Sequence, residues 1–227
     1  MVAETAFRTS LGTDELVVFV ERLLENLIPD GQVPAYSLRP HVEEALERTE
    51  NCFQRIHRKY YNLDGVVEFN HLNSDHVAAF LYFLGNTCWR RTGDTAVPTK
   101  LFYLNKILNG LDLYFSVALP EVFLLVHPVG TVIGNASYGD YLVVYQNCTI
   151  GADKGVYPTF GDGVILYSRT SVLGDSRVGD NVVFGANSFV VNAEVPANSI
   201  VVGQYPGHRL LPNSQTVRSR LFDTAAD

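Results

Sequence analysis

The 227-residue sequence predicts an α+β protein, in which a helical N-terminal domain precedes a parallel β-helix of six-residue repeats. Three observations predict this fold. Apolar residues follow helical spacing up to about residue 120, and 12 of the 18 glycines lie between Gly130 and Gly207. In the second half, a large apolar residue recurs at every sixth position. We expect a helical domain over residues 1–120, a β-helix over 121–205 and a tail over 206–227.

Four helices are expected in the N-terminal domain. Each has apolar residues spaced three and four apart, and together they cover residues 13–28, 39–61, 74–91 and 98–115. The third segment is apolar on almost all sides, which is typical of a helix in the middle of a bundle. We expect Ser74 to cap it, because a serine side chain can accept a hydrogen bond from a free backbone N–H of the first turn.

The hexad repeat indicates a triangular solenoid. Its large apolar positions are Tyr138, Val144, Ile150, Phe160, Leu166, Val172, Val178, Phe184 and Val190. Six residues suffice for one short strand and one corner, so three repeats make one turn, and stacked turns bury the large side chains. From Ile150 to Phe160 the spacing is ten residues. The extra residues, within "ADKGVYP", should leave the prism as a loop, and loops on rigid scaffolds commonly carry function.

Composition excludes several classes of protein. A net charge of −7 argues against nucleic-acid binding, which needs a basic surface. No apolar stretch reaches the roughly 20 residues of a membrane span. The first residues have neither the basic nor the apolar region of a secretion signal, so we expect a cytoplasmic protein. Three widely spaced cysteines, Cys52, Cys88 and Cys148, favour reduced thiols over a disulfide framework or a zinc site.

Several segments of the second half resemble one known family. They read "HPVGTVIG", "YQNCTIG", "YPTFGDGVILYSRTSVLG", "RVGDNVVFGANSFVV" and "VPANSIVVGQYPG". These segments, within residues 121–213, resemble the hexapeptide-repeat acyltransferases, and within them the serine acetyltransferase group. The resemblance implies a left-handed parallel β-helix that assembles as a homotrimer or a dimer of trimers. It also implies an acetyl-CoA donor bound in the groove between neighbouring subunits, a small-molecule acceptor and no metal.

His127 matches the catalytic histidine of that family. An acceptor hydroxyl needs a positioned base when it attacks a thioester, and imidazole has a suitable pKa. We therefore expect His127 to take the hydroxyl proton, and a backbone N–H near Gly151 and Ala152 to stabilise the oxyanion. We interpret Asp75, at the start of the helix expected over residues 74–91, as dipole or capping support for that helix, with contact to the acceptor as the alternative.

The resemblance also implies positions for the donor. The small residues Ala152, Ser168 and Ala186 match positions where the pantetheine arm pairs with backbone amides. Gly151, which precedes Ala152, is included among these donor-site candidates. A cation should lie near the 3′-phosphate. Arg169 is our candidate, and the other arginines considered are Arg209, Arg218 and Arg220.

Two departures from the family pattern concern the acceptor. Val126 stands where serine acetyltransferases usually have an acidic residue, and Tyr157 stands where they have a second histidine. Tyr157 remains a candidate for acceptor binding. These changes leave open a sugar or nucleotide-linked sugar acceptor, as in surface-polysaccharide biosynthesis.

Two further alternatives remain. A metal hydratase on the same scaffold needs three histidines on adjacent coils, whereas the repeat half has only His127 and His208. The other alternative is a trimeric scaffold without catalysis.

Overall fold

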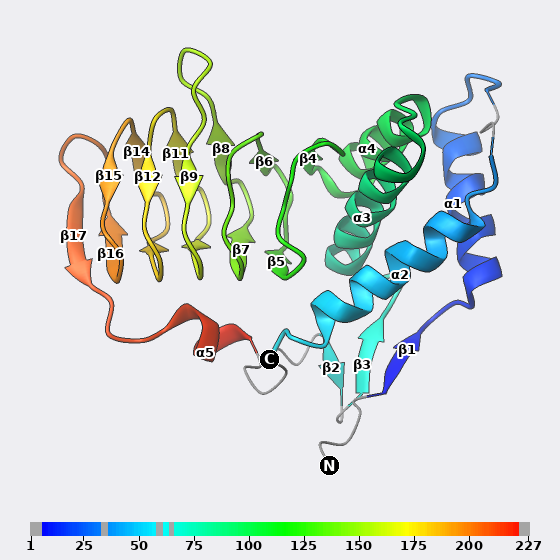
Figure 1. Ribbon diagram of the computed structural model, residues 1–227, viewed down its shortest axis with the longest axis horizontal. Helices are drawn as coiled ribbons and strands as arrows, with labels where there is room; N and C mark the ends of the chain where they lie inside the picture. Colours follow the sequence, from blue (N-terminus) through cyan, green and yellow to red (C-terminus); the bar gives the residue numbers. More distant parts are fainter. Residues whose placement is uncertain (1–5, 33–35, 58–60, 64–65, 223–227) are drawn as a thin grey trace.

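The protein is described here by a computed structural model, which covers residues 1–227 except 1–5, 33–35, 58–60, 64–65 and 223–227. A helical domain lies beside a β-helix whose coils stack away from it, so that the first coil is the one next to the helices (Figure 1). The predicted fold class is confirmed.

Four helices build the N-terminal domain. They are α1 (Thr13–Leu27), α2 (Arg39–Phe53), α3 (Ser74–Thr92) and α4 (Ala96–Asn109). An unbroken run of buried residues from His76 to Cys88 makes α3 the central helix, packed between α2 and α4, as its sequence predicts. Within the described part of the chain, no helix has the length and hydrophobicity that a membrane span requires.

A small sheet that the sequence did not predict lies at the edge of the helical domain. Its strands are β1 (Phe7–Thr9), β2 (Asn62–Leu63) and β3 (Val66–Phe69), in the order β1-β3-β2. Correspondingly, α2 ends at Phe53, earlier than the predicted 61, although residues 58–60 lie outside the described residues. Strands of two to four residues are too short to show a sequence period, so pairing between distant segments determines them.

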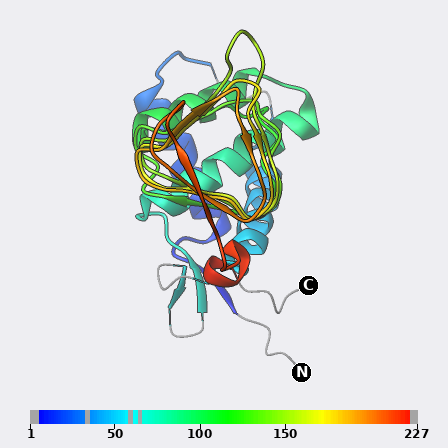
Figure 2. The same ribbon diagram turned by 90° about the vertical axis from the view of Figure 1, so that its left-hand side faces the viewer.

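Three parallel sheets form the faces of the β-helix (Figure 2). Face one consists of β5 (Phe123–Val126), β7 (Leu142–Tyr145), β10 (Ile165–Leu166), β13 (Val183–Phe184) and β16 (Ser199–Val202), with the antiparallel strand β17 (Arg209–Pro212) at its edge. Face two consists of β4 (Asp112–Leu113), β6 (Val132–Ile133), β8 (Thr149–Gly151), β11 (Ser171–Leu173) and β14 (Phe189–Val191). Face three consists of β9 (Thr159–Phe160), β12 (Arg177–Val178) and β15 (Glu194–Val195). Because β4 already belongs to face two, the stacking starts before the predicted boundary at residue 121, and the domain limits stay a prediction.

The hexad positions fill the prism. Val144, Leu166 and Phe184 lie above one another inside face one, and each is fully buried. Ile150 and Val172 fill the same role inside face two. Each coil buries its inner face only by stacking on its neighbours, which is the physical reason for the period.

The ten-residue spacing produces the predicted loop, and this loop is a short hairpin that projects from one edge of the prism (Figures 1 and 2). The backbones of Asp153 and Val156 pair in both directions at 3.0 Å. Lys154 and Gly155 form the turn, both with positive φ. Asn192 donates a hydrogen bond to the Asp153 carboxylate at 2.8 Å, which braces the hairpin on a lower coil.

The tail folds back along the β-helix through α5 (Val217–Leu221). The Val217 N–H donates to the Asn181 side chain at 2.9 Å, and the His57 N–H donates to the Leu221 carbonyl at 2.8 Å. Phe222 is buried beside Ile56. The tail therefore connects the last coils to the helical domain.

The buried cysteines are expected to be unreactive in the native state. Burial raises the pKa of the Cys52 and Cys88 thiols to about 12 and also raises the pKa of Cys148. A raised pKa means that the folded protein favours the neutral thiol. The stability that this preference contributes is present below the ordinary thiol pKa of 9.0 and is lost as pH rises toward 12. At pH 8, an aromatic disulfide reagent should titrate no thiol in native protein and all three after denaturation. A rapidly reacting native thiol would contradict this expectation.

Candidate active site

His127 lies on an outward bulge of the first coil. Val126 pairs with Tyr145, and Val132 pairs with Thr149. The corner of the first coil therefore contains five residues, 127–131. The equivalent corner of the next coil contains three, 146–148. The backbone of His127 adopts a left-handed φ of 48°, and its side chain is 72% exposed. The two extra residues place the imidazole outside the packed interior.

Asp75 in the first turn of α3 holds this bulge. Its Oδ2 accepts a hydrogen bond from the His127 backbone N–H at 3.0 Å and lies 3.4 Å from His127 Nδ1. The Asp75 side chain is 13% exposed. A carboxylate next to Nδ1 favours the tautomer with a proton on Nδ1, which leaves Nε2 to accept a proton. The helical domain therefore contributes directly to the site.

The cap of α3 differs from the prediction. Asn73, rather than Ser74, is the N-cap, and its side chain accepts the Asp75 backbone N–H at 3.0 Å. Asp75 itself lies in the first turn, where its negative charge also interacts favourably with the helix dipole.

A cavity of about 400 Å³ opens beside His127. Its apolar and aromatic lining comes from Tyr61, Leu72, Leu124, Leu125, Val126 and Tyr145. Its polar lining comes from Asn73, Ser74, Asp75 and His127. The cavity thus lies between the start of α3 and the first two coils of face one, and it is large enough for a small metabolite.

Tyr61 forms a neutral part of this wall. Burial, and then the negative charge of Asp75, raise the pKa of Tyr61 well above its ordinary value. Its hydroxyl donates to the Leu125 carbonyl at 3.2 Å. Tyr61 therefore packs the cavity floor and is unsuited to act as an acid or a base near neutral pH.

The other predicted site residues fall on two edges of face two. Ser168, Arg169 and Ala186 turn the same corner as His127 on lower coils, and we call this the His127 edge. Gly151, Ala152 and Tyr157 follow the far end of face two, and we call this the loop edge.

Tyr157 does not contact the cavity of its own chain. Its ring lies against Gly134, where an added Cβ would be 2.8 Å from Cε1. One chain therefore brings His127 and Asp75 together but separates them from Tyr157, Gly151 and Ala152.

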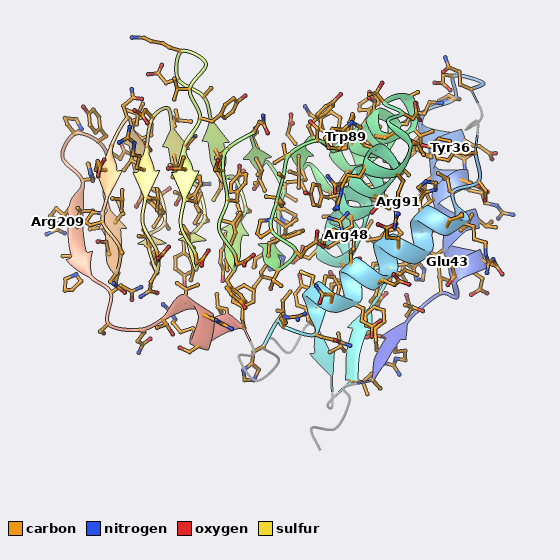
Figure 3. All side chains as sticks on the ribbon, viewed as in Figure 1. Tyr36, Glu43, Arg48, Trp89, Arg91 and Arg209 are labelled. Atoms are coloured by element: carbon orange, nitrogen blue, oxygen red, sulfur yellow. The ribbon has the colours of Figure 1, made fainter. Side chains whose placement is uncertain are left out.

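The candidate cations are also dispersed. Arg169 is exposed on the His127 edge, and Arg220 lies 3.4 Å from the Tyr167 hydroxyl. Arg218 stacks on the Tyr141 ring at 4.6 Å. Arg209, on β17, lies at the end of the β-helix farthest from the helices (Figure 3). Arg169 and Arg220 are thus closest to the edge that carries His127.

Sequence reasoning missed six residues of the cavity wall, which are Tyr61, Leu72, Asn73, Leu124, Leu125 and Tyr145. Leu72 and Asn73 lie in the same "HLNSDH" segment as Asp75, so proximity to that residue was an available signal. The ring centroids of Tyr145 and Tyr167 lie 4.9 Å apart in a tilted arrangement, and only the coil register places Tyr145 beside His127.

Removing the cap that positions Asp75 should weaken the protein. Asn73→Ala is expected to lower the free energy of unfolding by about 1 kcal/mol, because an N–H of the first turn loses its partner. Asn73→Ser, which can still cap, should lose only a few tenths of that energy. Urea unfolding monitored by circular dichroism measures both values. Equal losses for the two variants would show that the cap is unimportant.

Comparison with known proteins gives a consistent result. No protein family model matches the chain. The chain is 34% identical over 112 residues to a serine acetyltransferase of Synechococcus elongatus, covering 47% of this chain and 46% of that protein. It is 32% identical over 145 residues to a serine acetyltransferase of Mycobacterium tuberculosis, covering 62% of each. The matches therefore span about half to three fifths of these curated relatives.

The same fold occurs in solved structures. The serine acetyltransferase of Vibrio cholerae superposes with a TM-score of 0.68 at 21% identity, covering 89% of this chain and 82% of that one. The superposition therefore includes the helical domain as well as the β-helix.

Proposed function

Because the chain belongs to the hexapeptide-repeat acyltransferases, we propose that it transfers an acetyl group from acetyl-CoA to a hydroxyl of a small polar acceptor, as serine acetyltransferases do. The observation that carries this proposal is the His127–Asp75 pair beside a cavity, on the coil that matches the family. Pro128 and Thr131 of this bulge are buried, whereas the His127 side chain is 72% exposed, as a base that reacts with a bound acceptor must be.

The proposed chemistry uses His127 as the base. Nε2 removes the proton of the acceptor hydroxyl while the oxygen attacks the thioester carbonyl. The tetrahedral intermediate then expels the CoA sulfur, and the imidazolium returns the proton to that thiolate. Asp75 holds the ring and stabilises its positive charge in between.

Acetyl-CoA is proposed to lie along the His127 edge. A solved serine acetyltransferase with this fold is a complex with CoA, with a TM-score of 0.65 at 20% identity, covering 86% of this chain and 85% of that one. Ser168 and Ala186 are small, so an extended chain can approach the backbone there. Arg169 is on the same edge and is proposed to pair with a phosphate.

We propose a homotrimer, because the site residues of one chain lie on two separate edges. In a closed threefold ring, the His127 edge of one subunit meets a different edge of the next. The loop edge would then bring Gly151, Ala152 and Tyr157 to a neighbour's His127.

Exposed apolar side chains on α4 and the first coil support this assembly. They are Tyr103, Ile107, Tyr114, Val129 and Val132. Apolar surface of this kind is commonly covered when subunits associate.

The three buried free thiols support a reducing compartment, the cytosol.

The test is thiol release from acetyl-CoA with a panel of L-serine, amino sugars and nucleotide sugars. Acceptor-dependent release that requires His127 supports the proposal. The alternative, a scaffold without catalysis, predicts CoA binding with no acceptor-dependent release from any member of the panel. The buried cysteines will not add to the thiol signal at pH 8.

A further inference from the structure

We infer that the acceptor is a hydroxyl compound that carries an amine or similar donor and has no free carboxylate. This inference rests on the proposed function and specifies its substrate class. A solved serine acetyltransferase of Neisseria gonorrhoeae with this fold is a complex with serine, with a TM-score of 0.56 at 24% identity, covering 77% of this chain and 68% of that one. Serine carries a carboxylate, so the inference separates this chain from that protein.

The first argument is the charge of the cavity. Asp75 is its one acidic residue, and none of the described residues that line it is a lysine or an arginine. Asp75 Oδ1 is buried with no hydrogen-bond partner among the described residues, so its negative charge is incompletely compensated. A carboxylate placed here would be repelled, whereas an ammonium group would be attracted.

The second argument is the apolar wall. Leu72 is 80% exposed at the rim, and Leu124 and Leu125 are buried behind the cavity. Val126 occupies the position directly before His127. These side chains offer no donor to a carboxylate and displace the water that would solvate it. A carboxylate would have to pair with neutral donors such as Asn73 and Ser74, which compensate its charge less than a lysine or an arginine does.

The third argument concerns the loop edge, which the proposed trimer would bring to the cavity. Tyr157 lies against Gly134, and the Pro158 carbonyl accepts a hydrogen bond from the Ser137 N–H; neither residue carries a positive charge. Lys154 is the single lysine after residue 120, and it lies at the hairpin turn. Lys154 is therefore the one cation of the hairpin that could pair with a carboxylate if serine were the acceptor.

The experiment compares kcat/KM for thiol release with three matched acceptors. L-serinamide keeps the amine and hydroxyl of L-serine but removes the charge of its carboxylate, and 3-hydroxypropanamide also lacks the amine. We expect L-serinamide to exceed L-serine by about tenfold or more, and 3-hydroxypropanamide to be the weaker of the two amides. Equal or better turnover of L-serine overturns the inference but leaves the proposed function intact. Release no faster than with His127→Ala for all three acceptors, and for D-glucosamine, overturns the proposed function itself.

Three substitutions make the test specific to these residues. Leu72→Arg adds a cation at the rim and should lower the ratio of L-serinamide to L-serine by about tenfold. Leu72→Met, which keeps an apolar side chain, should leave the ratio unchanged. Lys154→Gln should also leave it unchanged. A rise of the ratio in Lys154→Gln would show that Lys154 holds the carboxylate of L-serine, which overturns the inference.

Discussion

Replacing His127 with alanine is expected to lower kcat/KM for acetyl transfer by about 10²- to 10⁴-fold, because the acceptor hydroxyl then loses its general base. The side chain is 72% exposed and outside the prism, so the free energy of unfolding should change by less than about 0.5 kcal/mol. Steady-state thiol release and urea unfolding measure the two effects separately. Full activity in the variant would remove His127 from the mechanism.

Asp75→Asn provides the control for this result. The amide keeps the size of the side chain and can still accept the His127 N–H, but it cannot stabilise the imidazolium. An activity between that of the unaltered protein and that of His127→Ala is therefore expected. Such a value would assign Asp75 to positioning and charge compensation, whereas unchanged activity would assign it to the fold alone.

Phe184→Ala is expected to cause the largest loss of stability, about 3 to 5 kcal/mol. Phe184 is fully buried inside face one, between Leu166 and Val201, and the stacked coils have little freedom to close the space that the ring leaves. The free energy of unfolding in urea, at one fixed protein concentration, measures the loss.

Two controls accompany this prediction. Phe184→Leu keeps most of the volume and should cost less than about 1.5 kcal/mol. Leu211→Ala removes a half-exposed side chain of β17 and should stay within about 0.5 kcal/mol. If Phe184→Ala costs no more than Leu211→Ala, the interior of the prism is less tightly packed than its burial indicates.

Much of the β-helix was predictable because its rule is local. Val172, for example, is buried between Ile150 and Val190 of the neighbouring coils, and the regular period repeats this packing along the chain. The same regularity predicted the loop after Ile150. Two sequence departures, Val126 and Tyr157, led to the prediction that the acceptor differs from serine, and this stays a prediction.

The sequence by itself thus determined the helical half, the hexad interior, the projecting loop and His127 as the candidate base. Tertiary structure alone decided the pairing of Asp75 with His127, the separation of Tyr157 from both, and the return of the tail to the helical domain. The physical reason is the range of the interactions. Stacked positions such as Ile150 and Val172 follow from the regular repeat. The contacts of Asp75 with His127 and of the tail with the helical domain join segments more than 50 residues apart, and their meeting depends on how the helices dock against the β-helix.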